Sequence, residues 1–201
     1  LSTIAVHDWT WSAALQQGRM KWQRGSLWQR NIQTNRWFQN RVCNVLPKLA
    51  RSKCPEPIVF AYSYAALEVF KLAKPLGCRT VLGQIDPGPV EMRLVQQLEN
   101  DHGGPKSESP PQSYWDDWHQ ECELADAIVV NSQWSRTAVI QEGVSESKLH
   151  VIPLAFESDV GRMETPRDIP NSFHNQRPLR ALFLGQAISR KGISETAKAI
   201  K

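Results

Sequence analysis

A short β-branched run, followed by a helix pattern and a second apolar run, most constrains what this chain can fold into. Ala127–Val130 reads AIVV, and so continuous an apolar run is typical of a strand buried on both faces. Asn131 and Ser132 end the run and offer oxygens that cap a helix, and Gly143 stands where that helix ends. Residues 149–153 predict a second buried strand. Such a strand–helix–strand unit closes right-handed, with parallel strands.

The same order of elements occurs earlier in the chain. Residues 57–63, PIVFAYS, predict a buried strand, residues 64–76 predict a largely apolar helix, and residues 79–85, RTVLGQI, predict another strand. The repeated alternation predicts an α/β fold with a Rossmann-like, doubly wound parallel sheet. Ligands of such sheets bind beyond the carboxyl ends of the strands.

Four polar residues follow the predicted strands and are candidates to line a cleft. Gln84 and Asp86 come after one strand, and Asn131 and Ser132 come after another. Asp86 either forms the turn before Pro87 and Gly88 or accepts a hydrogen bond from a substrate hydroxyl, acting as a base. Asn131 and Ser132 either cap the next helix or contact a ligand. Both interpretations remain open for each residue.

Composition narrows the class of protein. The chain has 201 residues, which is enough for one domain or for one domain and part of a second, and its 41% hydrophobic and 22% charged residues are typical of a folded globular protein. It has no apolar run of about 18 residues and no secretory signal pattern at its start. The histidines are scattered, and the cysteines show no C-x-x-C spacing, so we predict reduced thiols, no metal site and a cytoplasmic location. The cysteines are Cys43, Cys54, Cys78 and Cys122.

The N-terminal segment is basic and rich in tryptophan. Up to Cys54 it carries nine Lys or Arg against Asp8 alone, and from Leu27 its apolar residues recur at helical spacing until near Pro47. We favour a solvated basic helix face whose tryptophans lie in the core. A peripheral membrane contact through residues 9–53, at the inner face of a membrane, is the second interpretation. Nucleic-acid binding by stacking and phosphate contacts is the third and the least favoured.

Two stretches resemble the retaining glycosyltransferases of family 4. The first runs from residue 121, ECELADAIVVNSQWS, and continues through Gly143 and KLHVIP to the acidic Glu157; the second is LFLGQAISRKG at residues 182–192. The resemblance extends over residues 58–201 and implies a GT-B fold, in which two Rossmann-like domains face a cleft. It implies an acceptor-side domain over residues 1–156 that lacks its start, a linker over residues 157–178 and the first strand, residues 180–185, of a truncated nucleotide-sugar domain over residues 179–201.

The resemblance also implies a site for the donor diphosphate. Lys191 and Gly192 match the family's lysine and glycine, and Gln186 stands where the family carries an arginine. Either Arg190 supplies the second cation or the diphosphate is bound more weakly. Phosphates favour cations and helix N-termini, which suits this role. The implied diphosphate-binding residues are Gly185, Gln186, Arg190 and Lys191, and Glu157 is implied to line the cleft.

The implied reaction is a retaining sugar transfer that needs no metal and no cofactor. Its substrates are a nucleotide-diphosphate sugar and a sugar, lipid-linked or small-molecule acceptor. Gln84 and Asp86 occupy the neighbourhood where the family often places a histidine, so they are the candidate catalytic residues. The sequence contains no Asp-x-Asp metal motif, and no G-x-G-x-x-G follows a strand, which disfavours a dinucleotide enzyme. Alone, this chain is expected to be an inactive fragment.

Overall fold

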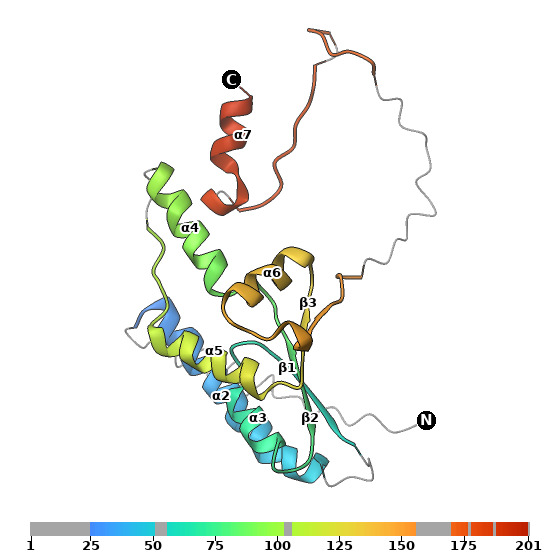
Figure 1. Cartoon of the computed structure of the whole chain (residues 1–201). Coiled ribbons are helices and arrows are strands. Elements are labelled where there is room, and N and C mark those ends of the chain that lie inside the picture. The colour runs from blue at the N-terminus through green and yellow to red at the C-terminus, as the bar shows by residue number, and fades with distance from the viewer. Residues whose placement is uncertain are drawn as a thin grey trace. The chain divides into compact units, whose positions relative to one another are not determined.

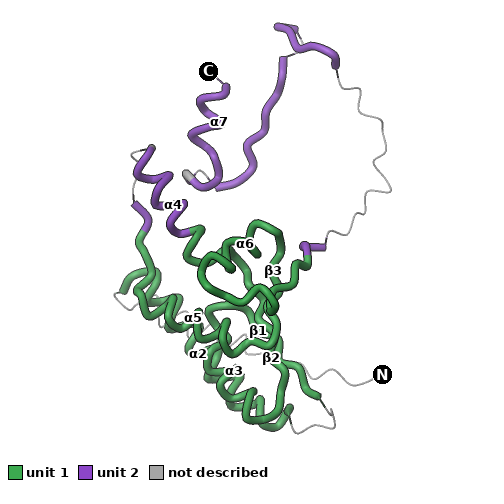
Figure 2. The backbone as a smooth tube through the Cα atoms, in the orientation of Figure 1, with its two compact units in different colours: residues 1–91, 108–152 green, residues 92–107, 153–201 purple. Residues whose placement is uncertain are grey.

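The computed structural model describes residues 25–50, 56–102, 106–155, 170–176, 178–186 and 188–200 (Figure 1). The chain divides into two compact units, one of residues 1–91 with 108–152 and one of residues 92–107 with 153–201 (Figure 2). The first unit differs from the predicted acceptor-side domain, residues 1–156, in leaving out residues 92–107 and 153–156. The greater part of the predicted linker lies outside the described residues.

A parallel sheet forms the centre of the first unit. Its strands are β1 (Ile58–Tyr62), β2 (Arg79–Gly83), β3 (Ala127–Val130) and β4 (Leu149–Val151). They pair in the order β1-β2-β3-β4, all parallel, which confirms the predicted α/β class. The connecting helices are α3 (Leu67–Ala73), α4 (Pro89–His102), α5 (Gln112–Leu124) and α6 (Gln133–Gln141). A doubly wound sheet reverses its strand order at one point, and the described strands contain no such reversal.

One face of the sheet carries the hydrophobic core. The register aligns Ala61 with Leu82, Ile128 and Leu149 in one row across the four strands. Leu82 and Ile128 are fully buried, and they pack with Phe70 of α3 and Trp118 of α5. Right-handed crossovers between strands taken in sequence order place the connecting helices on one side, and within the first unit α3, α5 and α6 cover this face.

The opposite face of β1 is exposed, which corrects the prediction of strands buried on both faces. Ile58, Phe60 and Tyr62 are 67%, 53% and 62% exposed, and β4 is likewise exposed at His150. The rings of Phe60 and Tyr62 lie over Gly83, where an added Cβ would come within 2.6 Å of Phe60 Cζ. The continuous apolar sequence of β1 therefore does not mean that both faces of the strand are buried. Its side chains alternate between the helix-covered face and a face that no described helix covers.

Helix α2 (Leu27–Ala50) packs against α3 on the covered side and confirms the helix predicted from Leu27. Leu46 is buried in the core cluster, and Pro47 lies within the C-terminal part of the helix. The indole of Trp28 is half-buried and donates to the Glu108 carbonyl at 2.7 Å, while the Arg41 guanidinium lies over the Trp37 ring at 5.6 Å. The rest of the basic, tryptophan-rich segment lies outside the described residues.

The second unit contains the residues expected to open a nucleotide-sugar domain. Its elements include the 3-10 helix η3 (Ser189–Lys191) and helix α7 (Ile193–Ala199). The strand predicted at residues 180–185 does not form, and Leu182 and Leu184 are 86% and 91% exposed. The prediction of a buried strand here is wrong for a physical reason. A strand is stabilised by backbone hydrogen bonds to a neighbour, and the described residues supply none for this segment.

Candidate functional site

Polar side chains meet where β1 and β2 end. Tyr64 follows β1, and its hydroxyl donates to Asp86 Oδ1 at 2.5 Å, while the backbone N–H of Gly88 donates to the same oxygen at 2.8 Å. Gln84 Nε2 approaches that oxygen at 3.3 Å and donates to the Asp86 carbonyl at 2.9 Å. The second carboxylate oxygen of Asp86, Oδ2, accepts no hydrogen bond within the described part of the chain. Both predicted catalytic residues thus lie together.

A core residue holds the side chain of Gln84 in place through a hydrogen bond. Its side chain is buried, and its Oε1 accepts a hydrogen bond from the indole N–H of the fully buried Trp118 at 2.9 Å. The same indole packs against Gly88, which has a φ of +67° in the turn after Asp86. With both ends of its amide bonded, Gln84 is placed to position Asp86. Trp118 connects the turn to the core.

Tyrosine and tryptophan rings surround this polar group. Tyr64 stacks on Tyr114 with ring centroids 4.7 Å apart, and Trp28 and Trp115 meet Tyr114 edge-on at 5.2 Å. Tyr64 has a φ of 72°, an uncommon conformation for a residue with a side chain. Burial, followed by the nearby charge of Asp86, raises the pKa of the Tyr64 and Tyr114 hydroxyls above their ordinary range. Both hydroxyls therefore stay protonated and neutral.

Glu121 fixes the backbone that carries Tyr64. This buried carboxylate of α5 accepts hydrogen bonds from the backbone N–H groups of Tyr64 at 2.7 Å, Ala66 at 2.8 Å and Leu67 at 3.0 Å. Gln39 of α2 accepts from the next N–H, that of Glu68, at 2.8 Å. A helix begins with N–H groups that have no partner inside the helix. Here two other helices supply the partners for α3.

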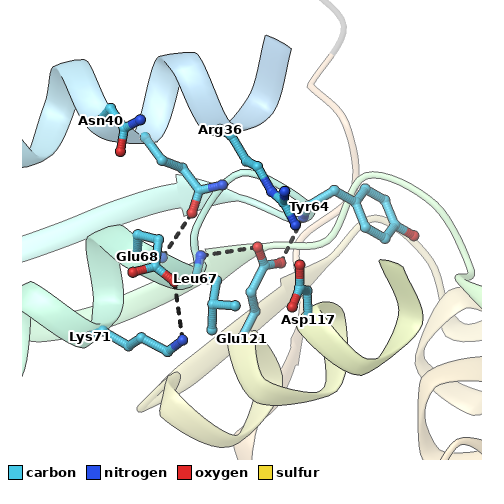
Figure 3. Close-up of a pocket in the computed structure, with 9 residues that line it drawn as sticks. Arg36, Asn40, Tyr64, Leu67, Glu68, Lys71, Asp117 and Glu121 are labelled. Carbon is cyan, nitrogen blue, oxygen red and sulfur yellow. Dashed lines mark hydrogen bonds and ion pairs between the residues drawn. The ribbon is translucent and has the colours of Figure 1, made fainter. Parts of the chain in front are cut away.

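A pocket of about 350 Å³ lies beside Glu121, between α2, α3 and α5 (Figure 3). Cations and carboxylates both line it: Arg36, Lys71, Glu68, Asp117 and Glu121. Lys71 is bonded to Glu68 at 3.0 Å, and Glu121 is occupied by the start of α3. Lys71, Glu68 and Glu121 are therefore engaged with the protein itself.

The Glu121 carboxyl gives the fold a pH dependence. Burial raises its pKa from the ordinary 4.5 to about 7, although the three backbone N–H groups favour the ionised form. The folded chain then binds the proton more tightly than the unfolded chain. The Glu121 carboxyl therefore contributes about 3 kcal/mol to the free energy of unfolding at low pH. This contribution is fully present below pH 4.5 and is lost as pH rises through 7. Urea unfolding of the wild type and Glu121→Gln at pH 5 and 7.5 measures it. An equal pH dependence in both proteins would contradict the assignment.

A second pocket, of about 570 Å³, opens at the carboxyl edge of the sheet, and we call it the carboxyl-edge pocket. Helix α2 contributes Asn31, Thr34 and Asn35 to its wall. The opposite wall consists of strand ends and rings, namely Tyr62, Ser63, Tyr64, Ala65, Ile85 and Tyr114. Because Tyr64 donates to Asp86, the pocket borders the polar group described above. This is the edge at which parallel α/β sheets bind ligands.

Asn131 and Ser132 follow β3 at the same edge and act as a helix cap. Ser132 Oγ accepts from the Ser135 backbone N–H at 3.1 Å, which confirms the cap at the start of α6. Asn131 Oδ1 accepts from the Ser135 hydroxyl at 3.0 Å. Their predicted contact with a ligand stays a prediction, and Glu157 lies outside the described residues.

The residues predicted to bind a diphosphate lie together in the second unit. Gly185 and Gln186 are exposed and precede η3, where the backbone N–H of Lys191 donates to the Ile188 carbonyl at 3.0 Å. Gly192 has a φ of +73° at the start of α7. Arg190 and Lys191 are exposed. Their binding of a donor diphosphate stays a prediction.

Sequence reasoning missed the residues that hold the site. Tyr64, Trp118 and Glu121 were not candidates, because a residue-by-residue pattern does not show which side chain reaches a distant backbone N–H. The run of aromatic residues at the start of α5 was the available signal for Trp118.

Within the described residues, no group of three or more His, Cys, Asp or Glu could hold a metal ion, and no helix is long and apolar enough to cross a membrane. Comparison with protein-family models, curated proteins and solved structures finds no match.

Proposed function

We propose that the chain belongs to a retaining, metal-independent glycosyltransferase of the GT-B type, which moves a sugar from a nucleotide-diphosphate sugar to an acceptor hydroxyl. The observation that carries the proposal is the polar group of Tyr64, Gln84 and Asp86 at the carboxyl edge of a parallel sheet. The two stretches that resemble family 4 support the reaction type.

Asp86 has the geometry of a group that receives an acceptor hydroxyl. Oδ1 is held by Tyr64, Gln84 and the Gly88 N–H, which fixes the plane of the carboxylate. In the proposal, Oδ2 accepts a hydrogen bond from the acceptor hydroxyl and orients it for transfer. Gln84 acts through Asp86, because its own amide is fully engaged.

Lys191 and Arg190 complete the proposed chemistry at the donor. The acceptor oxygen bonds to the anomeric carbon, its proton passes to Asp86, and the bond from the anomeric carbon to the diphosphate oxygen breaks. Negative charge then develops on the departing diphosphate. Fixed cations stabilise that charge, a role that a metal ion has in other transferases. Gln186 adds a hydrogen-bond donor without charge at the position where the resembled family has an arginine.

A donor panel tests the proposal. Transfer or hydrolysis of UDP-, GDP- and ADP-sugars is measured with the protein that carries the complete second domain implied by the resemblance. We expect turnover with one donor, about hundredfold lower in Lys191→Ala and in Asp86→Ala, because each loses a group that acts on the transition state. Lys198→Ala, a change of the same type in α7, should match the wild type.

Absence of turnover with every donor would count against the transferase. The basic helix α2, which carries no acidic residue, would then be the first candidate for a peripheral membrane contact. If Lys191→Ala turns over the donor as fast as the wild type, the proposed reaction still holds, but Lys191 does not stabilise the departing diphosphate.

A further inference from the structure

We infer that the carboxyl-edge pocket binds an uncharged, hydroxyl-rich ligand, such as a sugar ring or a polyol, between the asparagines of α2 and the tyrosines beyond β1. The inference rests on the proposed function in one respect: it identifies that ligand as the acceptor. The pocket itself is a feature of the first unit alone, with a volume of about 570 Å³, which suits a small-molecule ligand.

The wall of the pocket lacks charge. None of its lining residues is Lys, Arg, His, Asp or Glu, and the buried hydroxyls of Tyr64 and Tyr114 are neutral. A buried charge on a ligand needs an opposite charge or several donors to offset its lost hydration. The Asp86 carboxylate, which accepts from the Tyr64 hydroxyl beside the pocket, would repel a phosphate or a carboxylate, whereas its Oδ2 can accept from a ligand hydroxyl. An uncharged ligand is therefore favoured.

Two amides on α2 supply the polar recognition. Asn31 and Asn35 are four residues apart, so they project from the same face of the helix, and both line the pocket. Their side chains form no hydrogen bond with the described residues. Each amide offers two N–H donors and one oxygen acceptor. A hydroxyl group both donates and accepts, so a pair of neighbouring hydroxyls matches an amide, whereas a phosphate only accepts and an ammonium only donates.

Aromatic and aliphatic surface faces these amides. Tyr62 and Ile85 are 62% and 53% exposed although both side chains are large and apolar, and Tyr114 completes this wall. A tyrosine combines an apolar ring with a polar hydroxyl. It is therefore common where one side of a binding surface is apolar and the other side is hydrated. The C–H face of a sugar ring meets such rings while its hydroxyls reach the amides.

The two walls are held in place before any ligand arrives. Trp28 joins α2 to the segment before α5 through its bond to the Glu108 carbonyl, and its ring meets Tyr114 of α5 edge-on at 5.2 Å. Tyr114 in turn stacks on Tyr64, whose hydroxyl is bonded to Asp86. A pocket whose side chains are already ordered loses less entropy on binding.

Ligand-observed NMR and calorimetry test the inference, with the intact chain and no donor present. The neutral probes are mannose, trehalose and myo-inositol; the charged probes are glucose 6-phosphate and glucuronate, and adenosine serves as an uncharged heterocycle. We expect a neutral hydroxyl-rich probe to bind best, and about tenfold or more weaker in Asn31→Ala/Asn35→Ala, which loses both amides. Alanine favours the helix, so this variant should fold. Asn44→Ala, exposed on the same helix outside the pocket, should bind as the wild type does.

Three outcomes would overturn the inference: no binding by any neutral probe, tighter binding of a charged probe or adenosine, or equal binding by the double variant and Asn44→Ala. Because the measurement needs no donor, its failure differs from failure of the transferase. Sugar binding without turnover in the donor panel would support the ligand assigned to the pocket and contradict the proposed transferase reaction. Turnover without loss in Asn31→Ala/Asn35→Ala keeps the reaction and places the acceptor elsewhere.

Discussion

Glu121→Ala is expected to lower the free energy of unfolding by about 3 to 5 kcal/mol. The carboxylate accepts from the backbone N–H groups of Tyr64, Ala66 and Leu67, and alanine leaves all three without a partner. Ala66 and Leu67 are buried, so water does not readily replace the lost acceptor. Each buried N–H without an acceptor costs about 1 to 3 kcal/mol. Urea denaturation followed by circular dichroism measures the change.

Glu123→Ala is the matched control for this experiment. Glu123 is an exposed glutamate two residues away on α5, and its side chain makes no hydrogen bond within the described residues. Its replacement should change the free energy of unfolding by less than about 0.5 kcal/mol. Equal effects of the two substitutions would show that Glu121 does not secure the start of α3.

Trp118→Ala is expected to cost about 3 to 5 kcal/mol of unfolding free energy, because a large aromatic side chain is removed from the core. The indole is fully buried, and it packs with Trp115 at 6.4 Å and beneath the turn at Gly88. Its loss also leaves Gln84 Oε1 without a donor. We expect the turn that holds Asp86 to lose order, visible as fewer distinct NMR signals from residues 84–88.

Two further variants test the place of Trp118 in the core. Trp118→Phe keeps one aromatic ring but loses the five-membered ring and its N–H, so a loss of about 1 to 3 kcal/mol is expected from the smaller cavity and the missing hydrogen bond. Trp134→Ala removes the same side chain from α6, where it is 53% exposed, and should have a much smaller effect. Equal losses at positions 118 and 134 would contradict the central place of Trp118.

The repeating strand–helix pattern predicted the class of fold well because its signal is local. The runs at residues 57–63, 79–85 and 127–130 became neighbouring parallel strands. The helix cap was one of two interpretations of Ser132, drawn from its place between a strand and a helix, and the bond from the Ser135 N–H confirms that interpretation. In each case the determining interaction lies within a few residues of the position that shows it.

Burial and isolated strands were predicted less well. The apolar run of β1 indicates a strand but does not show which neighbours cover each face, and three of its five side chains are exposed. Residues 180–185 have a similar composition and form no strand. A strand needs a partner for its backbone groups and a layer for each face, and both come from distant parts of a chain.

The sequence by itself determined the order of elements, the parallel sheet and the place of Gln84 and Asp86 at a carboxyl edge. Only the tertiary structure decided what surrounds Asp86. Tyr64 lies 22 residues before it, and Trp118 lies 34 residues after Gln84. Glu121 reaches across 57 residues to the N–H of Tyr64. Periodicity and capping act between near neighbours, whereas the acceptor that satisfies a buried donor is chosen by packing, and packing joins residues that the chain keeps apart.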